Sequence, residues 1–254
     1  MASGEAGELL MSQTQTSTAA HLEAARRRGR GLMSVEASGA RSYEVLHGAN
    51  AAREGAILVL ALWAVLAGTG WTGPTAALLC AAAAALALYS GVSNGLTVSA
   101  QLRHCERELR REREEIRTQP EWEREEMRAI YEAKGFSGEI LERILDTLCS
   151  DDDRLLKVML EEELGIFFEQ WNHPVLIGLV TGGAALAGGL TVAGAALSGT
   201  VWAAPVAAAG VIAATAVIRN GGVHAGAAES FGRWSIATIA VAGMAYFLSQ
   251  LLAA

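Results

Sequence analysis

The chain of 254 residues carries a formal net charge of −7, and 19% of its residues are charged, against about 25% in soluble domains. Twenty of the 27 acidic residues lie in 102–173, whereas 55–93 and 174–218 contain no Asp, Glu, Lys or Arg. This distribution excludes an ordinary soluble enzyme, a secreted disulfide scaffold, a disordered chain and, because basic and acidic residues are mixed, a general nucleic-acid binder.

Residues 1–41 are predicted to form a disordered cytosolic tail. They are rich in Ser, Thr, Gly and Ala and contain one basic cluster at 26–30. They include no apolar run of the kind found in signal peptides. We interpret the tail as reinforcing membrane topology, with binding of nucleic acid or of a specific lipid as the alternative.

Five apolar segments are long enough to cross a bilayer, which takes about 20 residues. They lie near 47–67, 75–97, 175–197, 202–218 and 231–252. The alternative, buried helices of a soluble protein, is disfavoured because such helices are rarely apolar on all sides over runs of 39 and 45 residues (55–93 and 174–218). The sequence therefore predicts an all-α, five-span transmembrane protein with a cytosolic helical insert between spans two and three.

Basic residues give the orientation. Six Arg precede residue 54 and twelve Lys or Arg lie in 102–173, whereas the turns near 68–74 and 198–201 have none. Because basic loops stay in the cytoplasm, the N-terminus and the insert are predicted to be cytoplasmic. Two Lys against eighteen Arg indicate a GC-rich genome, and we expect a bacterial inner membrane. The predicted parts are the tail 1–41, spans one and two in 42–101, the insert 102–173, and spans three to five in 174–254.

Small residues recur at helical spacing in the third span. Gly178 and Gly182 are four residues apart, as are Ala184 and Gly188. Small faces let membrane helices approach closely. The pattern predicts tight helix packing, within one chain or between two.

The insert is predicted to be helical throughout. Residues 101–117 continue span two, and 118–120 break that helix. Pro120 opens a second helix that Gly135 ends at its C-terminus. Ser137 is predicted to cap a third helix ending near 149. Ser150 or Asp151 starts a fourth, which runs to about 165.

Possible metal ligands in the insert occur in pairs that share a helix face. The spacing is i, i+3 in the first two pairs and i, i+4 in the third. The pairs are Glu112 with Glu115, Glu123 with Glu126, and Met159 with Glu163. If the helices form a small bundle, the carboxylates converge and repel one another unless a cation is present. Their oxygens suit Fe²⁺, Mn²⁺, Mg²⁺ or Ca²⁺, and a thioether favours a transition ion.

A simpler interpretation competes with the metal site. Charged helices are commonly solvated, and pairs such as Glu125 with Arg128 keep them soluble. Spacing alone leaves both interpretations open.

Residues 120–165 resemble the cytosolic insert of the vacuolar iron transporter family, which transports Fe²⁺ and Mn²⁺. The plan of five spans is similar, as are the runs 97–101 and 242–248, and the resemblance covers about 42–252. It implies a homodimer whose inserts bind divalent metal through Glu and Met. The residues at the family's motif positions are Glu112, Glu115, Glu123, Glu126, Met159 and Glu163, and Leu160 stands where the family often has a second Met.

The resemblance also implies a path through the membrane. The family's first span carries an acidic residue in a Gly-Ala-Asn-Asp-Gly-like stretch, and Glu54-Gly55 is the counterpart here. His47 and Asn50 share a helical face with Glu54, and the neighbouring Arg53 is the alternative partner for its carboxylate. In the second span, Ser90 and Asn94 occupy the positions of a family Met and Glu.

These expectations combine into one function. The chain is predicted to be a homodimeric transporter, not an enzyme, that exports Fe²⁺ or Mn²⁺ from the cytosol by proton antiport. The ion is the cargo, no organic cofactor is expected, and no P-loop indicates ATP use. Its partners are the lipid bilayer and divalent metal, not nucleic acid. The alternatives are a membrane-anchored metal-binding or sensing protein that has lost transport, and a structural membrane protein whose insert contacts other proteins.

Overall fold

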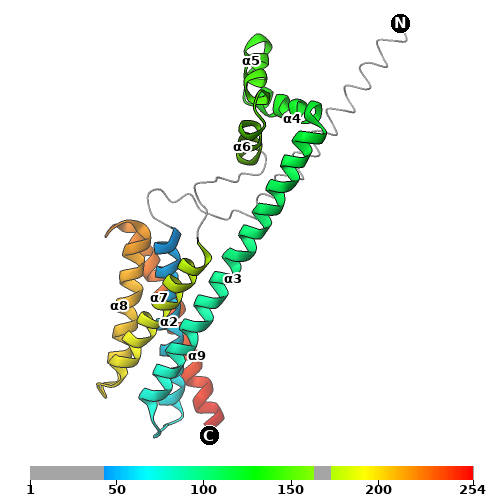
Figure 1. Cartoon of the computed structure of the whole chain (residues 1–254). Helices are drawn as coiled ribbons and strands as arrows, with labels where there is room; N and C mark the ends of the chain where they lie inside the picture. Colours follow the sequence, from blue (N-terminus) through cyan, green and yellow to red (C-terminus); the bar gives the residue numbers. More distant parts are fainter. Residues whose placement is uncertain (1–42, 163–172, 254) are drawn as a thin grey trace. The chain divides into compact units, whose positions relative to one another are not determined.

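The computed structural model describes residues 43–162 and 173–253, and within these ranges every regular element is a helix. The predicted tail 1–41, Glu163 and the expected end of the fourth insert helix lie outside the described residues. The helices are α2 (Tyr43–Gly68), α3 (Thr75–Thr118), α4 (Pro120–Ala133), α5 (Gly138–Cys149), α6 (Asp152–Glu162), α7 (Pro174–Ala196), α8 (Ala203–Asn220) and α9 (Ala225–Ala253) (Figure 1).

Five of these helices are long and apolar enough to cross a membrane, namely α2, α3, α7, α8 and α9. They confirm the predicted all-α, five-span fold. The chain divides into two compact units. The membrane unit has described residues 43–99 and 173–253, and the insert unit has described residues 100–162. Helix α3 belongs to both, because its apolar first half continues into the charged second half without a break.

The membrane unit is organised around α2, which contacts α7, α8 and α9 (Figure 1). Its buried centre contains Val59 of α2, Leu79 of α3 and Val192 of α7, surrounded by alanines. Large apolar side chains such as Leu88 and Ile239 are more than 70% exposed on its outer surface. An apolar exterior around a small-residue interior is what a lipid environment requires.

Two glycines bring the backbones of α2 and α7 into contact. A Cβ at Gly188 would lie 1.9 Å from the carbonyl oxygen of Ala52, and one at Gly55 would lie 2.2 Å from that of Ala185. Glycine is therefore required at both positions. The predicted close approach of small residues in α7 is thus observed within the chain.

The insert unit has its own apolar core, made by the end of α3 with α4, α5 and α6. Its most buried side chains include Met127 of α4, Leu145 of α5 and Met159 of α6. Pro120 is the first residue of α4, as predicted. Helix α4 ends at Ala133, and Gly135 just beyond it has φ +94°, which lets the amide of Phe136 donate to the carbonyl of Tyr131 over 3.1 Å.

The starts of α5 and α6 differ from each other. Ser137 precedes α5 in extended backbone, but its side chain forms no capping hydrogen bond. The expected serine cap was wrong in that respect. At α6, by contrast, the Asp151 carboxylate accepts a hydrogen bond from the amide of Arg154 over 2.8 Å. Of the two residues proposed to start this helix, Asp151 is therefore the one that caps it.

Charged side chains join α4 to α5. Arg124 donates to Glu142 over 3.0 Å and to Asp146 over 2.7 Å, and Arg128 also donates to Glu142. Hydrogen bonds from Arg128, and then from Arg124, lower the pKa of the Glu142 carboxyl below its ordinary value. These contacts hold α5 against α4.

This junction predicts a pH dependence. Because the pKa of Glu142 is lowered in the folded state, its contribution to stability is complete above the ordinary Glu pKa of about 4.3 and is lost as the pH falls through the lowered value. Relative to the parent, Glu142→Gln should speed hydrogen exchange of the α4 and α5 amides at pH 6–7, and the difference should vanish in acid. Glu139→Gln is the control, because Glu139 pairs with Arg143 of its own helix and not with α4. A difference that persists unchanged in acid would contradict this account.

Candidate metal centre

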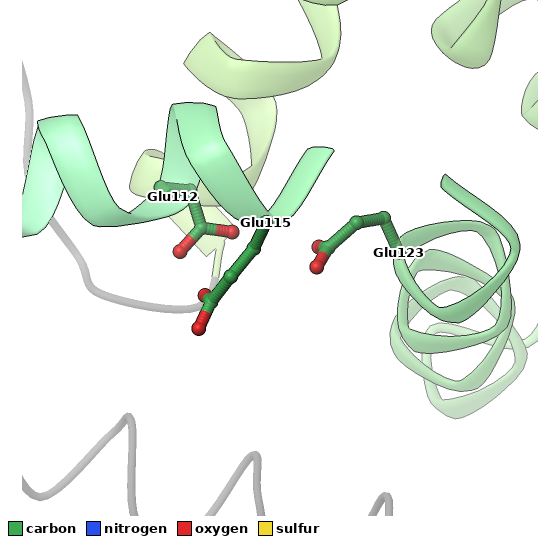
Figure 2. A group of neighbouring side chains, drawn as sticks. All are labelled: Glu112, Glu115 and Glu123. Carbon is green, nitrogen blue, oxygen red and sulfur yellow. The ribbon is translucent and has the colours of Figure 1, made fainter. Parts of the chain in front are cut away.

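Three carboxylates meet where α3 turns into α4. Glu112 and Glu115 project from α3, one helical turn apart, and Glu123 of α4 points toward them (Figure 2). One oxygen from each lies within 4.8 Å of the others. The break between Thr118 and Pro120 produces this convergence, because it turns the chain and directs the first turn of α4 back toward α3.

The burial of this group distinguishes it from a solvated acidic surface. Glu112 is 1% exposed and Glu123 is 4% exposed. The Glu115 side chain is 29% exposed and provides the solvent-accessible side. Two ionised carboxylates within 4.8 Å repel each other by about 3 kcal/mol at an effective dielectric constant near 20. A divalent cation held between them would convert this repulsion into attraction.

A basic residue flanks the group. Arg111 lies 3.5 Å from the Glu115 carboxylate and 3.3 Å from that of Glu108. It orients Glu115 and offsets part of the local negative charge. The sequence reasoning missed this residue, although its i, i+4 spacing to Glu115 is a detectable signal.

The other predicted ligands of the insert have different surroundings. Glu126 is buried one turn beyond Glu123 on α4, but it is not in the group within 4.8 Å. Met159 is fully buried in the apolar core of the insert unit, which also contains Met127. Glu163 lies outside the described residues. Met127 is a second thioether that the sequence reasoning missed, although it lies four residues after Glu123, on the same face of α4.

The predicted path residues of α3 contact each other. The Asn94 amide donates to the Ser90 carbonyl over 2.8 Å and lies 3.4 Å from the Ser90 hydroxyl. Ser90 is buried, and its carbonyl also lies 3.5 Å from the hydroxyl of Thr181 on α7. Ser90 therefore lies at the interface between α3 and α7, and Asn94 lies one helical turn further along α3.

The predicted path residues of α2 share one face of the helix but have different surroundings. Glu54 is exposed on the surface of the membrane unit, and His47 is half-buried with its ring 4.0 Å from that of Tyr43. The Asn50 oxygen accepts hydrogen bonds from Arg53 over 3.1 Å and from Arg219 of α8. Arg53 is buried toward Asn50 and forms no ion pair with Glu54 among the described residues. Adjacent helical residues point about 100° apart, which separates Arg53 from Glu54.

Comparison with known proteins agrees with the architecture. The model of the VIT family matches residues 49–253, most of the chain. No curated protein matched the chain in a sequence search. The matched segment includes four of the five membrane helices in full, most of α2, and all three carboxylates of the group at the α3–α4 turn.

Proposed function

Because the chain belongs to the VIT family, whose members are membrane metal-ion transporters and not enzymes, we propose that it exports Fe²⁺ or Mn²⁺ from the cytosol. The ion is the cargo, and proton antiport is the proposed driving reaction. The N-terminus and the insert are on the cytosolic side of a bacterial inner membrane in this proposal, following the distribution of Arg and Lys.

The observation that carries the proposal is the carboxylate group of Glu112, Glu115 and Glu123, in which Glu112 and Glu123 are buried. Carboxylate oxygens are ligands for Mn²⁺ and Fe²⁺, and burial excludes competing water. In this proposal the group captures cytosolic metal through the accessible side at Glu115. Glu126, Met159 and Glu163 complete the set when metal binds, with the Met159 thioether favouring a transition ion over Mg²⁺ or Ca²⁺.

We place the route through the membrane at the surface of α2 that carries Glu54. A carboxylate exposed to lipid is costly, so such a residue is normally covered by protein or lines an aqueous path. A second copy of the chain covering this surface would meet that requirement, and it is the proposed homodimer. The proposed polar residues along the route are His47, Asn50, Ser90 and Asn94. For Asn50 to contact the ion, its oxygen must give up the hydrogen bonds that it accepts from Arg53 and Arg219.

The test is Mn²⁺ flux into proteoliposomes that contain a Mn²⁺-quenched dye, with and without a pH gradient. We expect Glu54→Gln to lower the flux by roughly 10–100-fold or more. Mutating a residue that only hydrogen-bonds to a metal ligand already has an effect of that size. Glu44→Gln is the matched control, since Glu44 is in the first turn of the same helix. Normal flux through Glu54→Gln would remove Glu54 from the path. Mn²⁺ flux that is the same with and without a pH gradient would exclude proton antiport as the driving reaction.

A second candidate is a metal-binding or sensing protein that has lost transport. Arg53 favours this second candidate, because a buried guanidinium beside the proposed route repels cations. Ser90 and Asn94 favour it as well, because they are weaker metal ligands than the Met and Glu found at these positions in the family. This candidate predicts metal binding by the insert in the wild-type protein together with no flux in the same preparation.

A further inference from the structure

We propose that α2, α8 and α9 form a binding site for an anionic phospholipid. Its phosphate would lie at Arg53 and Arg219, and one acyl chain would occupy the apolar cavity between the same three helices. This site is separate from the carboxylate group of the insert and does not depend on metal transport.

The polar end of the site brings Arg53 and Arg219 together on one neutral side chain, that of Asn50. Arg53 is 4% exposed, and its Nε atom has no hydrogen-bond partner. Its guanidinium lies 3.5 Å from the centre of the Trp234 ring on α9, and it shares the Asn50 oxygen with Arg219. Neither arginine forms an ion pair with a carboxylate among the described residues. Two guanidinium groups thus converge on one neutral oxygen.

A buried cation in this setting favours an anionic partner. A single amide oxygen does not balance two positive charges, and burying uncompensated charge is costly. Phosphate oxygens match guanidinium donors in geometry and charge. The partially exposed Arg219 lies in the last turn of α8, which leaves a route by which a phosphate can approach. Basic pockets between membrane helices bind lipid head groups in this way.

The apolar end of the site is a cavity of about 510 Å³ lined by residues of α2, α8 and α9. It begins at Leu60, two helical turns or about 10 Å along α2 from Arg53. It continues past Ile212 of α8 and Ile239 of α9 to Trp202. The Ser235 hydroxyl in this lining is a buried polar group that forms no hydrogen bond within the described part of the chain, and it lies one residue after Trp234, near the arginine end.

The two ends together identify a lipid in preference to a free anion. Each of the three helices contributes first to the cationic group and then, further along its axis, to the apolar cavity. A charged head followed by an apolar tail is the chemistry of an anionic phospholipid. Free inorganic phosphate would satisfy the arginines and leave the cavity without an occupant.

The test measures thermal unfolding of the full-length protein in detergent with added phosphatidylglycerol, phosphatidylcholine or inorganic phosphate. Phosphatidylglycerol should bind about tenfold more tightly than phosphatidylcholine, the scale of one charge-assisted hydrogen bond. Arg219→Gln should abolish this preference. Arg233→Gln is the matched control, because Arg233 is exposed and already paired with Glu229, and it should retain the preference.

Each other outcome overturns the proposal. Equal binding of the two lipids would exclude recognition of net negative charge, and stabilisation by inorganic phosphate equal to that by phosphatidylglycerol would make the site a free-anion site. Loss of the preference in both variants, or in neither, would show that Arg219 is not the head-group contact. If Arg219→Gln does not fold, Arg219→Lys serves instead. It keeps the charge but loses the two-pronged donor geometry, and it should weaken phosphatidylglycerol binding without removing it.

Discussion

The double substitution Glu112→Gln/Glu123→Gln is expected to remove high-affinity Mn²⁺ binding while leaving the fold intact. Both side chains are buried in the group whose oxygens lie within 4.8 Å, and an amide oxygen carries no charge to hold a divalent ion. We expect the dissociation constant to rise by about 100-fold or more. At a metal concentration 100 times the wild-type constant, stabilisation by metal would fall from about 2.7 to about 0.4 kcal/mol.

Calorimetry and thermal unfolding of the full-length protein measure both quantities. The matched control is Glu114→Gln/Glu121→Gln, which makes the same change in charge on the same two helices at exposed positions. If the control weakens Mn²⁺ binding as much as the buried pair does, the effect is one of net charge and the carboxylate group is not a metal site. If neither variant binds less metal than the parent, both metal-based functions fail and the family relation indicates the fold alone.

The membrane helices and the α3–α4 turn were predictable because they depend on local signals. Long stretches without charge fix the spans, and Pro120 and Gly135 fix the bounds of α4. Once the chain turns at 118–120, the i, i+3 spacing of Glu112 and Glu115 is enough to place them opposite the first turn of α4.

Residues that depend on the packing of distant helices were not predictable in the same way. The i, i+3 spacing paired Glu126 with Glu123. At the observed angle between α3 and α4, Glu123 lies within 4.8 Å of the two α3 carboxylates and Glu126 is not in that group. Packing of Ile116 of α3 with Met127 and Ile130 of α4 in the apolar core sets that angle. Three leucines of α6 lie in the same apolar core as Met159. Their positions in the sequence predict that this face of α6 is buried, but the spacing of possible ligands does not take them into account.

The arginines of the membrane unit show the same limit. Sequence adjacency suggested that Arg53 neutralises Glu54, whereas helical geometry turns the two side chains apart. The contact between Arg219 and Asn50 joins residues 169 positions apart. No local pattern indicates it, because it exists only when α8 packs against α2.

The second large effect is expected at the crossing of α2 and α7. In Gly188→Ala the new methyl group would lie 1.9 Å from the backbone oxygen of Ala52, and backbone cannot move aside as a flexible side chain can. The two helices must therefore separate, at a cost of about 1–3 kcal/mol or more in the free energy of unfolding. At Gly194 in the same helix, the added carbon of an alanine would meet no atom of the described residues within 4 Å beyond the local backbone of α7, so Gly194→Ala should be neutral or mildly stabilising.

Thermal unfolding of the two variants side by side tests the crossing, and flux extends the test to function. Gly55, which follows Glu54, meets the backbone of Ala185 in the same interface, so moving α7 away also moves the segment that carries Glu54. Gly188→Ala should then lose Mn²⁺ flux while Mn²⁺ binding by the insert unit is retained, because the two units have separate cores. Equal melting temperatures for Gly188→Ala and Gly194→Ala would mean that α2 and α7 do not pack this closely in the membrane, and a parallel loss of binding and flux would mean that the units are not independent.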